Sequence, residues 1–469
     1  MHAHTGGWLE GLIRREPLSV LPELAVREVL RRMCEADAAE AVVVAPSTGQ
    51  PLGILTERDV IERIAQPAES LDVPVAGLMT GGVVALPRTA GVHEARLLLA
   101  RHRLRRLVVV DELGRLAGVV SRDDLYAVRR PAADDLIGRI QAARDEAGLI
   151  DAARQVSERA AALVDGGEQA GRMGEWIALL NDLLVQAAID LAEAEFDLPL
   201  APWCWLAFGS EGRLEQTLNT DQDNGLIFLA AGEAESDSLR ARFLPFARRV
   251  NGLLDACGFP LCQGGIMAGN SRWCLSLDEW RYCFADWMRS ASADDLLNAT
   301  IFFDFRALAG DAALADALRG GLLTAAADNP LFLRFMTENA LRSGPPLGRI
   351  RDFVVDRQSG RLELKRDGTR LFVDAARIYA LELGLASTST VDRLRAAGNL
   401  LRWSGREIDA LTDAFEFILQ LRLRRQRVPG VPANQVAPDE LNELERAFLK
   451  ESLRQARRLQ DRLRSRYQL

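Results

Sequence analysis

The first 130 residues contain an internal repeat, and this repeat constrains the fold of the chain more than any other feature. The apolar triplet Val42–Val44 recurs as Val108–Val110, and the segment Gly53–Asp59 recurs as Gly118–Asp124. Each copy reads as strand, helix, strand, short turn, strand and helix, because apolar runs of strand length alternate with turn residues. The sequence therefore predicts that residues 15–130 form one pseudo-symmetric module made of two similar halves.

Both copies close on the same pattern: a glycine, two apolar residues, a hydroxyl residue and, three positions later, an aspartate. The hydroxyl residues are Thr56 and Ser121, and the aspartates are Asp59 and Asp124. Such a pair can simply cap the N-terminus of a helix, where it satisfies free backbone N–H groups. The pattern also resembles the signature of CBS (cystathionine-β-synthase) domains. That resemblance implies an adenosine nucleotide between the copies, with Thr56 and Ser121 at its phosphate and Asp59 and Asp124 at its ribose. It also implies a homodimer formed through the CBS pair.

A glycine-rich turn followed by two aspartates lies in the middle of the chain. The turn spans Gly209–Glu215, and Asp221 and Asp223 follow it. Residues 203–208 predict a buried strand that leads into the turn, and residues 225–229 predict a strand that follows the aspartates. Because residues i and i+2 of a strand point to the same face, Asp221 and Asp223 would present two neighbouring carboxylates.

Two neighbouring carboxylates repel each other and are costly unless a cation lies between them. Hard oxygen ligands of this kind suit Mg²⁺, which also binds substrate phosphates. A lone Asp-x-Asp is more often a solvated turn, but the glycine turn, Arg213, Glu215 and the two flanking strands favour a metal site. Gly209 lets the backbone approach a phosphate closely, and Ser210 offers a hydroxyl and an N–H group.

This combination resembles the nucleotidyltransferase fold. The uridylyltransferases that modify the PII signalling protein have a similar turn, and the matching residues here are Gly209, Gly212, Arg213, Glu215, Thr220, Asp221 and Asp223. Ser210 makes the turn more similar to that of a family of bacterial signal-transduction proteins. Members of that family join paired CBS domains, a nucleotidyltransferase-like domain and a helical C-terminal domain. The resemblance covers the chain from about Pro17 onward.

The resemblance implies transfer of a nucleoside monophosphate from a nucleoside triphosphate in the presence of Mg²⁺. Asp221 and Asp223 would hold the metal. Gly209 and Ser210 would cradle the β- and γ-phosphates, and Arg213 would neutralise the charge that develops during transfer. Glu215 would orient Arg213 or the turn. A glycine-rich segment over residues 264–270, and Trp273 after it, would line the nucleotide cleft. The full phosphate- and nucleotide-binding set is Gly209, Ser210, Gly212, Glu215, Thr220 and Asn270.

Many nucleotidyltransferases take a third carboxylate from a neighbouring strand, and the sequence does not reveal one here. The segment 264–270 contains none, and Asp304 is expected to pair with Arg306 or with a neighbouring arginine. This departure keeps open a second hypothesis, in which the fold is a nucleotide-sensing signalling module without turnover. A third hypothesis is a scaffold that assembles through its CBS pair.

Composition narrows the choice of function. No apolar run approaches the roughly 18 residues of a membrane helix, and the N-terminus lacks a signal-peptide pattern, so we expect a cytoplasmic protein that does not bind membranes. The net charge of −8 argues against general nucleic-acid binding and favours a protein acceptor over RNA. No Gly-Lys-Ser/Thr sequence is present, which excludes a Walker A loop. No histidine follows His102, so a His-Asp module that would remove the nucleotide again is excluded.

The sequence as a whole predicts an α/β multidomain protein. After the CBS pair, residues 131–196 are expected to form a helical connector, residues 197–325 the nucleotidyltransferase-like domain and residues 326–469 a helical substrate-binding domain. Ser276 and Glu279 form a capping box that opens a helix, and its aromatic stripe is expected to pack in the core: Trp280, Phe284 and Trp287. The arginine-rich tail over residues 439–468 is expected to be a solvated helix face rather than a docking face for an acidic partner.

Overall fold

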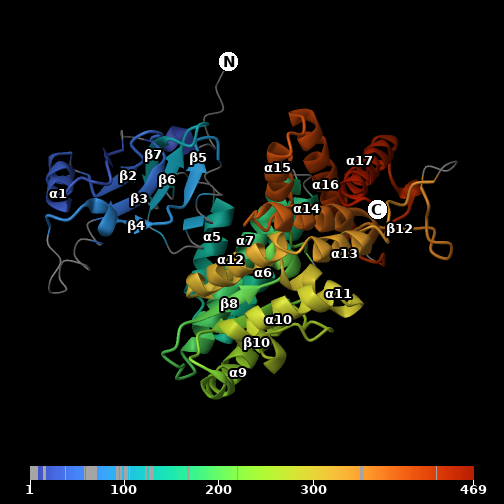
Figure 1. Ribbon diagram of the computed structural model, residues 1–469, viewed down its shortest axis with the longest axis horizontal. Helices are drawn as coiled ribbons and strands as arrows, with labels where there is room; N and C mark the ends of the chain where they lie inside the picture. The colour runs from blue at the N-terminus through green and yellow to red at the C-terminus, as the bar shows by residue number, and fades with distance from the viewer. Residues whose placement is uncertain are drawn as a thin grey trace. The chain divides into compact units, whose positions relative to one another are not determined.

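A computed structural model gives the fold of the chain (Figure 1). It describes residues 9–13, 17–36, 38–56, 59, 71–90, 95, 98–99, 104, 106–121, 124–125, 131–165, 170–218, 220–348, 353–428 and 430–469. The chain divides into two compact units, Met1–Ile137 and Gly138–Leu469. Each unit is described by itself below.

The first unit contains two small sheets that repeat the same pairing. In the first sheet β1 (Ser19–Val20) pairs parallel with β2 (Glu40–Val44), β2 pairs antiparallel with β3 (Pro51–Thr56), and β3 pairs with β4 (Thr80–Gly81). In the second sheet β5 (Ala85–Pro87) pairs parallel with β6 (Arg106–Val110), which pairs antiparallel with β7 (Leu116–Ser121). Even the register shift recurs, between Val43 and Val44 and between Val109 and Val110. The predicted internal repeat is therefore confirmed in the described residues.

Each copy of the repeat has its own apolar core. Helix α1 (Val26–Glu35) covers the first sheet with Val26, Val29 and Met33, which are all buried. This unit also contains two single-turn 3₁₀ helices, Leu9–Leu12 and Val75–Gly77. The two copies meet where the Leu116 N–H donates to the Gly49 carbonyl (3.0 Å).

Three helices follow the two small sheets along the chain, as the sequence predicts for residues 131–196. Helix α5 (Pro131–Ala142) spans the boundary between the two units, and α6 (Glu146–Asp165) and α7 (Ala170–Glu193) belong to the second unit. Apolar residues of these helices are buried, for example Ile137, Ile140 and Leu149 and, on α7, Ile177, Leu180 and Leu184.

A four-stranded mixed sheet forms the centre of the second unit, in the order β10-β9-β8-β11. Strands β8 (Trp203–Ala207) and β9 (Asn224–Phe228) are antiparallel, β10 (Cys274–Ser276) runs parallel to β9, and β11 (Arg306–Gly310) runs antiparallel to β8. The predicted strands on either side of the glycine turn are thus the two central strands. Burial of β8 and β9 over nearly their whole length explains their continuous apolar sequences.

Helices α9 (Glu233–Ala256), α10 (Leu277–Ser290) and α12 (Ala312–Ala327) pack against this sheet together with α7, and α11 (Ala293–Phe302) packs against α10. The predicted capping box at Ser276 and Glu279 is present, and the aromatic stripe of α10 is buried, so both predictions are confirmed. Trp273 also lies in this core, with its ring centroid 4.3 Å from that of Phe302. Helix α9 runs through Pro245.

The C-terminal part is mainly helical, and its helices gather away from α9 and β10 in Figure 1. Its helices are α13 (Pro330–Ala340), α14 (Arg370–Leu383), α15 (Thr390–Leu400), α16 (Gly405–Arg425) and α17 (Glu443–Tyr467). A π-helical turn, Lys365–Thr369, precedes α14, and two short strands pair beside it: β12 (Leu362–Glu363) and β13 (Gln435–Val436). One apolar core runs from Cys204 on β8 to Leu463 on α17. No described helix is long and apolar enough to cross a membrane.

Candidate active site

The glycine turn after β8 forms a single helical turn, α8 (Gly209–Gly212). Gly209 adopts φ +57°, a left-handed conformation that favours glycine, and an added Cβ would lie 3.4 Å from Asp223 Oδ2. The Phe208 N–H donates to the Asp223 carbonyl (2.9 Å), which extends the pairing of β8 and β9 by one bond. The backbone therefore holds the turn against the second aspartate.

The Asp pair lies just before β9, as the sequence predicts, so the strand geometry behind the prediction does not itself set the direction of the two side chains. Strand β9 starts at Asn224. The two carboxylates still share one side, because Gln222 between them is buried on the other side and donates to the carbonyls of Asn251 (3.0 Å) and Phe259 (2.8 Å). Anchoring of Gln222 thus replaces the strand ladder as the cause of the predicted arrangement.

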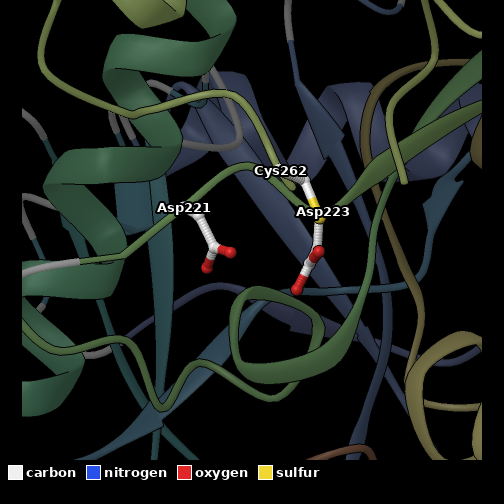
Figure 2. A group of neighbouring side chains, drawn as sticks. All are labelled: Asp221, Asp223 and Cys262. Carbon is white, nitrogen blue, oxygen red and sulfur yellow. The ribbon is translucent and has the colours of Figure 1, made fainter. Parts of the chain in front are cut away.

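Cys262 lies beside the Asp pair, and the sequence did not reveal it as a candidate. Single ligand atoms of Asp221, Asp223 and Cys262 all lie within 4.8 Å of one another. Figure 2 shows both carboxylates pointing to the same side of the loop, with the Cys262 sulfur beside Asp223. Burial and the Asp221 carboxylate raise the pKa of Asp223 to about 6, although the Cys262 thiol and Lys365 act in the opposite direction. These groups form a set of donors that a divalent metal could share.

The glycine-rich segment 264–270 bonds to Asn224, the residue that follows the Asp pair. The Asn224 N–H donates to the Ile266 carbonyl (3.2 Å), and the Asn224 side chain accepts from the Ala268 N–H (2.9 Å). Asn270 donates through Nδ2 to the Gly265 carbonyl (2.9 Å), and its Oδ1 caps the following 3₁₀ turn. The structure therefore gives Asn270 a role in shaping this segment.

Asp304 is the centre of a buried charge cluster. Its Oδ2 accepts from Arg213 Nη1 (2.8 Å) and Arg377 Nη2 (2.7 Å), and its Oδ1 accepts from Arg393 Nη1 (2.6 Å). Burial alone would raise the pKa of Asp304, but the three guanidinium groups hold it well below its usual range. We call these four residues the Asp304 cluster; Arg377 and Arg393 bring α14 and α15 against the nucleotidyltransferase-like domain.

The predicted pairing of Asp304 with Arg306 is wrong, whereas pairing with other arginines is confirmed. Arg306 forms an ion pair with Asp182 on α7 and donates to the Glu211 carbonyl (3.0 Å). Strand geometry explains the difference, because Arg306 is the first residue of β11 and is directed toward α7. Burial raises the pKa of Glu211 to about 8, while Arg306 acts in the opposite direction.

The turn residues that follow α8 are fixed by the C-terminal helices. Glu215 Oε2 accepts from Arg213 Nε (2.7 Å), and its Oε1 accepts from the Thr390 N–H at the start of α15 (2.8 Å). The Thr388 hydroxyl donates to the Gly212 carbonyl (2.7 Å). A Cβ at Gly212 would lie 1.9 Å from the Asp304 carbonyl oxygen, so only glycine fits there. Glu215 thus holds Arg213 in place, and its carboxylate is fully engaged.

One cavity of about 220 Å³ joins these features. One wall comes from the glycine turn, the Asp pair and α11, and the other wall comes from the π-helical turn, α14 and α16. Seven predicted site residues line it: Gly209, Ser210, Arg213, Glu215, Thr220, Asp221 and Asp223. Gly212 and Asn270 do not line this cavity. The sequence did not reveal the C-terminal wall, which includes Lys365, Thr369, Arg370, Arg377 and Arg422.

The predicted CBS ligand residues bond to each other within each copy. The Thr56 hydroxyl and N–H donate to Asp59 Oδ2 (2.6 and 2.8 Å), and the Asp59 N–H donates to the Thr56 hydroxyl (3.3 Å). Ser121 and Asp124 repeat this pattern, with the hydroxyl 2.5 Å from Asp124 Oδ2. These are the reciprocal bonds of a helix cap, as the simpler interpretation of the motif expects.

Three family models match the chain. The model described as "Putative nucleotidyltransferase DUF294" matches residues 154–294, and the model described as "Putative nucleotidyltransferase substrate binding domain" matches residues 330–467. The CBS domain model matches twice, at residues 9–66 and 75–130. The chain therefore belongs to the family that joins paired CBS domains to a DUF294 nucleotidyltransferase domain and its substrate-binding domain.

Curated relatives match over shorter stretches. An uncharacterized protein of Methanopyrus kandleri is 29% identical over 116 residues, which are 24% of this chain and 59% of that protein. The inosine-5′-monophosphate dehydrogenase of Aquifex aeolicus is 27% identical over 154 residues, and these are 32% of this chain and 30% of the enzyme. The magnesium transporter MgtE of Thermus thermophilus is 32% identical over 136 residues, or 28% of this chain and 29% of the transporter. The chain thus spans less than two thirds of the length of each of these relatives.

Solved structures of CBS proteins are also similar to part of the chain. A CBS domain protein from Pyrobaculum aerophilum, complexed with AMP, is 28% identical and covers 28% of this chain and 98% of its own, with a TM-score of 0.25. A CBS-domain protein from Agrobacterium tumefaciens is 27% identical and covers 28% of this chain and 99% of its own, also with a TM-score of 0.25.

Proposed function

We propose that this chain is a Mg²⁺-dependent nucleotidyltransferase, similar to the uridylyltransferases of the PII protein, that transfers a nucleoside monophosphate to a hydroxyl group of a protein. One observation carries the proposal. Asp221 and Asp223 share a cavity with the Gly209–Ser210 turn, and the opposite wall of that cavity belongs to the substrate-binding domain. A metal-bound nucleotide and an acceptor could therefore meet in one place.

The donor set suits a divalent metal ion. The two carboxylates point to the same side, and the absence of a side chain at Gly209 leaves Asp223 Oδ2 accessible. Cys262 Sγ lies close enough to both carboxylates to bind a soft divalent ion with them, whereas Mg²⁺ would be held by the two carboxylates. When bound, the ion would polarise the phosphoryl oxygens and favour deprotonation of the attacking hydroxyl.

In the proposed reaction the acceptor oxygen forms a bond to the α-phosphorus, and the bond between the α-phosphorus and the oxygen that bridges to the β-phosphate breaks. Pyrophosphate leaves, and the hydroxyl proton passes to an aspartate of the pair or to water. Ser210 and the N–H groups of the turn would bind phosphate oxygens. Arg213, held by Glu215 and Asp304, would offset the negative charge of the transition state.

We further propose that the acceptor is a protein, because the net charge of −8 is unfavourable for an RNA substrate. The CBS pair would bind an adenosine nucleotide through Thr56, Asp59, Ser121 and Asp124, would regulate transfer, and would form a homodimer. The repeated hydroxyl–aspartate motif supports this part of the proposal.

The test offers radiolabelled UTP, ATP, GTP and CTP with Mg²⁺ to a cell extract and the purified protein, followed by protease or ribonuclease. Label that resists ribonuclease and is lost to protease is the expected result. Label that resists protease and is lost to ribonuclease would contradict a protein acceptor. The variant carrying Asp221→Asn and Asp223→Asn serves as the control without transfer.

A second candidate function is nucleotide sensing without turnover. The observation that favours it is the engagement of Asp304 with three arginines, which leaves this carboxylate unable to act as a third metal ligand. A sensor should bind nucleotide in calorimetry and release no pyrophosphate over hours. Release of pyrophosphate that depends on Mg²⁺ and on an acceptor protein would eliminate the sensor.

A further inference from the structure

The charged residues that line the cavity fall into two groups. In the first group each arginine has a carboxylate partner: Arg213, Arg370 and Arg377. The second group makes no ion pair within the part of the chain that the structure describes, and it contains two anions and two cations: Asp221, Asp223, Lys365 and Arg422. The unpaired carboxylates come from the nucleotidyltransferase-like domain, and the unpaired cations come from the substrate-binding domain.

Arg422 is a buried cation that is held only by neutral groups. It lies on α16 with 8% of its surface exposed. Its Nε donates to Asn434 Oδ1 (3.0 Å), and its Nη1 donates to the Thr369 hydroxyl (3.2 Å). Burial lowers the pKa of Arg422 to about 10. The charges of Glu363 and Glu215 act against this decrease in the pKa, but neither carboxylate bonds to the guanidinium, so part of the cost of its lost hydration stays uncompensated. An anionic ligand in the cavity would supply that charge.

Lys365 is the second unpaired cation, and its residue type stands out in this chain. Among 58 basic residues, only Lys365 and Lys450 are lysines. Lys365 begins the π-helical turn, a rare element that often marks functional positions. It lines the same cavity as Asp221 and Asp223, and its charge is among those that lower the pKa of Asp223. A lysine binds phosphate as a compact point charge on a flexible stem.

We propose that Lys365 and Arg422 form the binding site for the polyphosphate tail of the nucleotide and for the pyrophosphate that leaves. The identity of the ligand rests on the proposed function. A polyphosphate in the cavity would lie between these two cations and a metal ion on the Asp pair, so that all four unpaired charges gain a partner. Thr369 holds Arg422 and belongs to the turn that carries Lys365, which couples the two cations.

The scarcity of lysine gives a direct test on the full-length protein. The aldehyde of pyridoxal 5′-phosphate condenses with a lysine amine to an imine and releases water, and borohydride then reduces the C=N bond. We expect Lys365 to be modified at least tenfold faster than Lys450, and inorganic tripolyphosphate to protect Lys365 alone. Sodium chloride at equal ionic strength should not protect it. Equal rates at the two lysines, or no protection by tripolyphosphate, would overturn the proposal.

Calorimetry with inorganic tripolyphosphate, without metal, tests both cations. Lys365→Met and Arg422→Met should each weaken binding at least tenfold. Two matched controls should leave it unchanged: Lys450→Met, and Arg424→Met on the same helix, where Arg424 pairs with Glu445 outside the cavity. The melting temperature of Arg422→Met should stay the same or rise, because a buried unpaired charge is removed, whereas a purely structural arginine would lower it. Lys365 is exposed, so wild-type affinity in Lys365→Met would overturn the proposal even if Arg422→Met does not fold.

The same measurements separate this inference from the proposed function. Tripolyphosphate binding that depends on Lys365 and Arg422, in a protein that never transfers a nucleotide, would sustain the anion site and contradict the transferase. Transfer with an unchanged KM for the nucleoside triphosphate in both variants would sustain the transferase and contradict the anion site.

Discussion

Two groups of charge meet where the nucleotidyltransferase-like domain contacts the C-terminal helices, and they are built in opposite ways. In the Asp304 cluster one carboxylate with no exposed surface is surrounded by three arginines, and both of its oxygens accept hydrogen bonds from them. In the cavity the unpaired carboxylates and the unpaired cations belong to different domains. Every charge of the Asp304 cluster has a partner without a ligand, and we call this cluster the closed group. The four unpaired charges of the cavity, Asp221, Asp223, Lys365 and Arg422, have no such partner among the described residues, and we call them the open group.

This difference separates charges that hold the fold from charges that await a ligand. A buried ion network costs much desolvation and is stable only when every member is paired. A charge that stays unpaired beside a cavity has no ion pair to compensate its desolvation in the free protein. Arg213 connects the two groups, since it bonds to Asp304 and also lines the cavity. It therefore transmits the rigidity of the cluster to the site.

The largest effect should come from the closed group. Asp304→Asn leaves Arg393 buried without a carboxylate partner and removes one of the two carboxylate partners of Arg377, so we expect a loss of about 3–5 kcal/mol in the free energy of unfolding. Urea unfolding followed by tryptophan fluorescence measures it. The control is Asp286→Asn, whose pair with Arg289 is exposed and should contribute less than about 1 kcal/mol. A similar small loss in both variants would show that the cluster is not structural.

The next effect concerns the open group and should appear in activity, not in stability. Asp221→Asn with Asp223→Asn should slow pyrophosphate release at least about 10²-fold, the scale seen when a group that stabilises transition-state charge is removed. The melting temperature should not fall, because neither carboxylate makes an ion pair in the described structure. Asp278→Asn, on the exposed first turn of α10, is the control. A large drop in melting temperature with normal activity would show that the Asp pair stabilises the fold and does not act in the reaction.

The open group should also respond to pH in a way that the closed group does not. Because the pKa of Asp223 is raised to about 6, its carboxyl binds a proton as the pH falls through that value, and metal affinity should fall about tenfold per pH unit below it. In the metal-free protein the sign for stability is opposite: the raised pKa favours folding at low pH, and this contribution is lost as the pH rises through about 6. Electron paramagnetic resonance of Mn²⁺ between pH 5 and 8, in wild type and Asp223→Asn, measures the first effect; unchanged Mn²⁺ affinity across this range would contradict it.

A smaller effect should come from the thiol. Cys262→Ser should lower the affinity for Cd²⁺, a thiophilic ion, by about tenfold and should change the affinity for Mg²⁺ little, since sulfur is a poor ligand for hard ions. The ultraviolet charge-transfer band of a Cd²⁺–thiolate bond reports the coordination directly. Cys283→Ser, a half-buried thiol on α10, is the control. A band that survives in Cys262→Ser would remove Cys262 from the site.

The smallest effect concerns the CBS pair. Its hydroxyl and aspartate side chains bond to each other, so, like the closed group, they have partners without a ligand. Thr56→Ala should cost about 1 kcal/mol of stability, as the loss of a helix cap usually does. Calorimetry of the full-length protein with AMP, ADP and ATP then decides whether the motif also binds a ligand. Heat of binding that disappears in Thr56→Ala supports the regulatory proposal; no heat at millimolar nucleotide would leave the motif a cap.

The sequence predicted the features that depend on short-range patterns. The repeat, the two central strands, the capping box of α10 and the aromatic stripe follow from spacing and residue type, and all are confirmed. The side-by-side Asp pair was also expected, although its cause is the anchoring of Gln222.

The features that were missed depend on packing between distant segments. Cys262 reaches the Asp pair across a separation of about 40 residues, because the Gln222 N–H bonds to the Pro260 carbonyl and brings this loop alongside. Two of the three partners of Asp304, Arg377 and Arg393, lie on α14 and α15, and no local sequence pattern connects these helices to Asp304. One signal was available and was not used: the near-absence of lysine, which makes Lys365 conspicuous.

The apolar core that runs from β8 to α17 has a consequence for how this protein can be divided. The segments matched by two separate family models both contribute to that core. Their separate boundaries suggest two domains that could be exchanged independently, but the shared core argues against this. A chain cut after residue 325 would strand Asp304 and Arg213 without Arg377 and Arg393 and would expose the sheet. Chimeras and crystallisation fragments should therefore keep residues 138–469 together as a single unit.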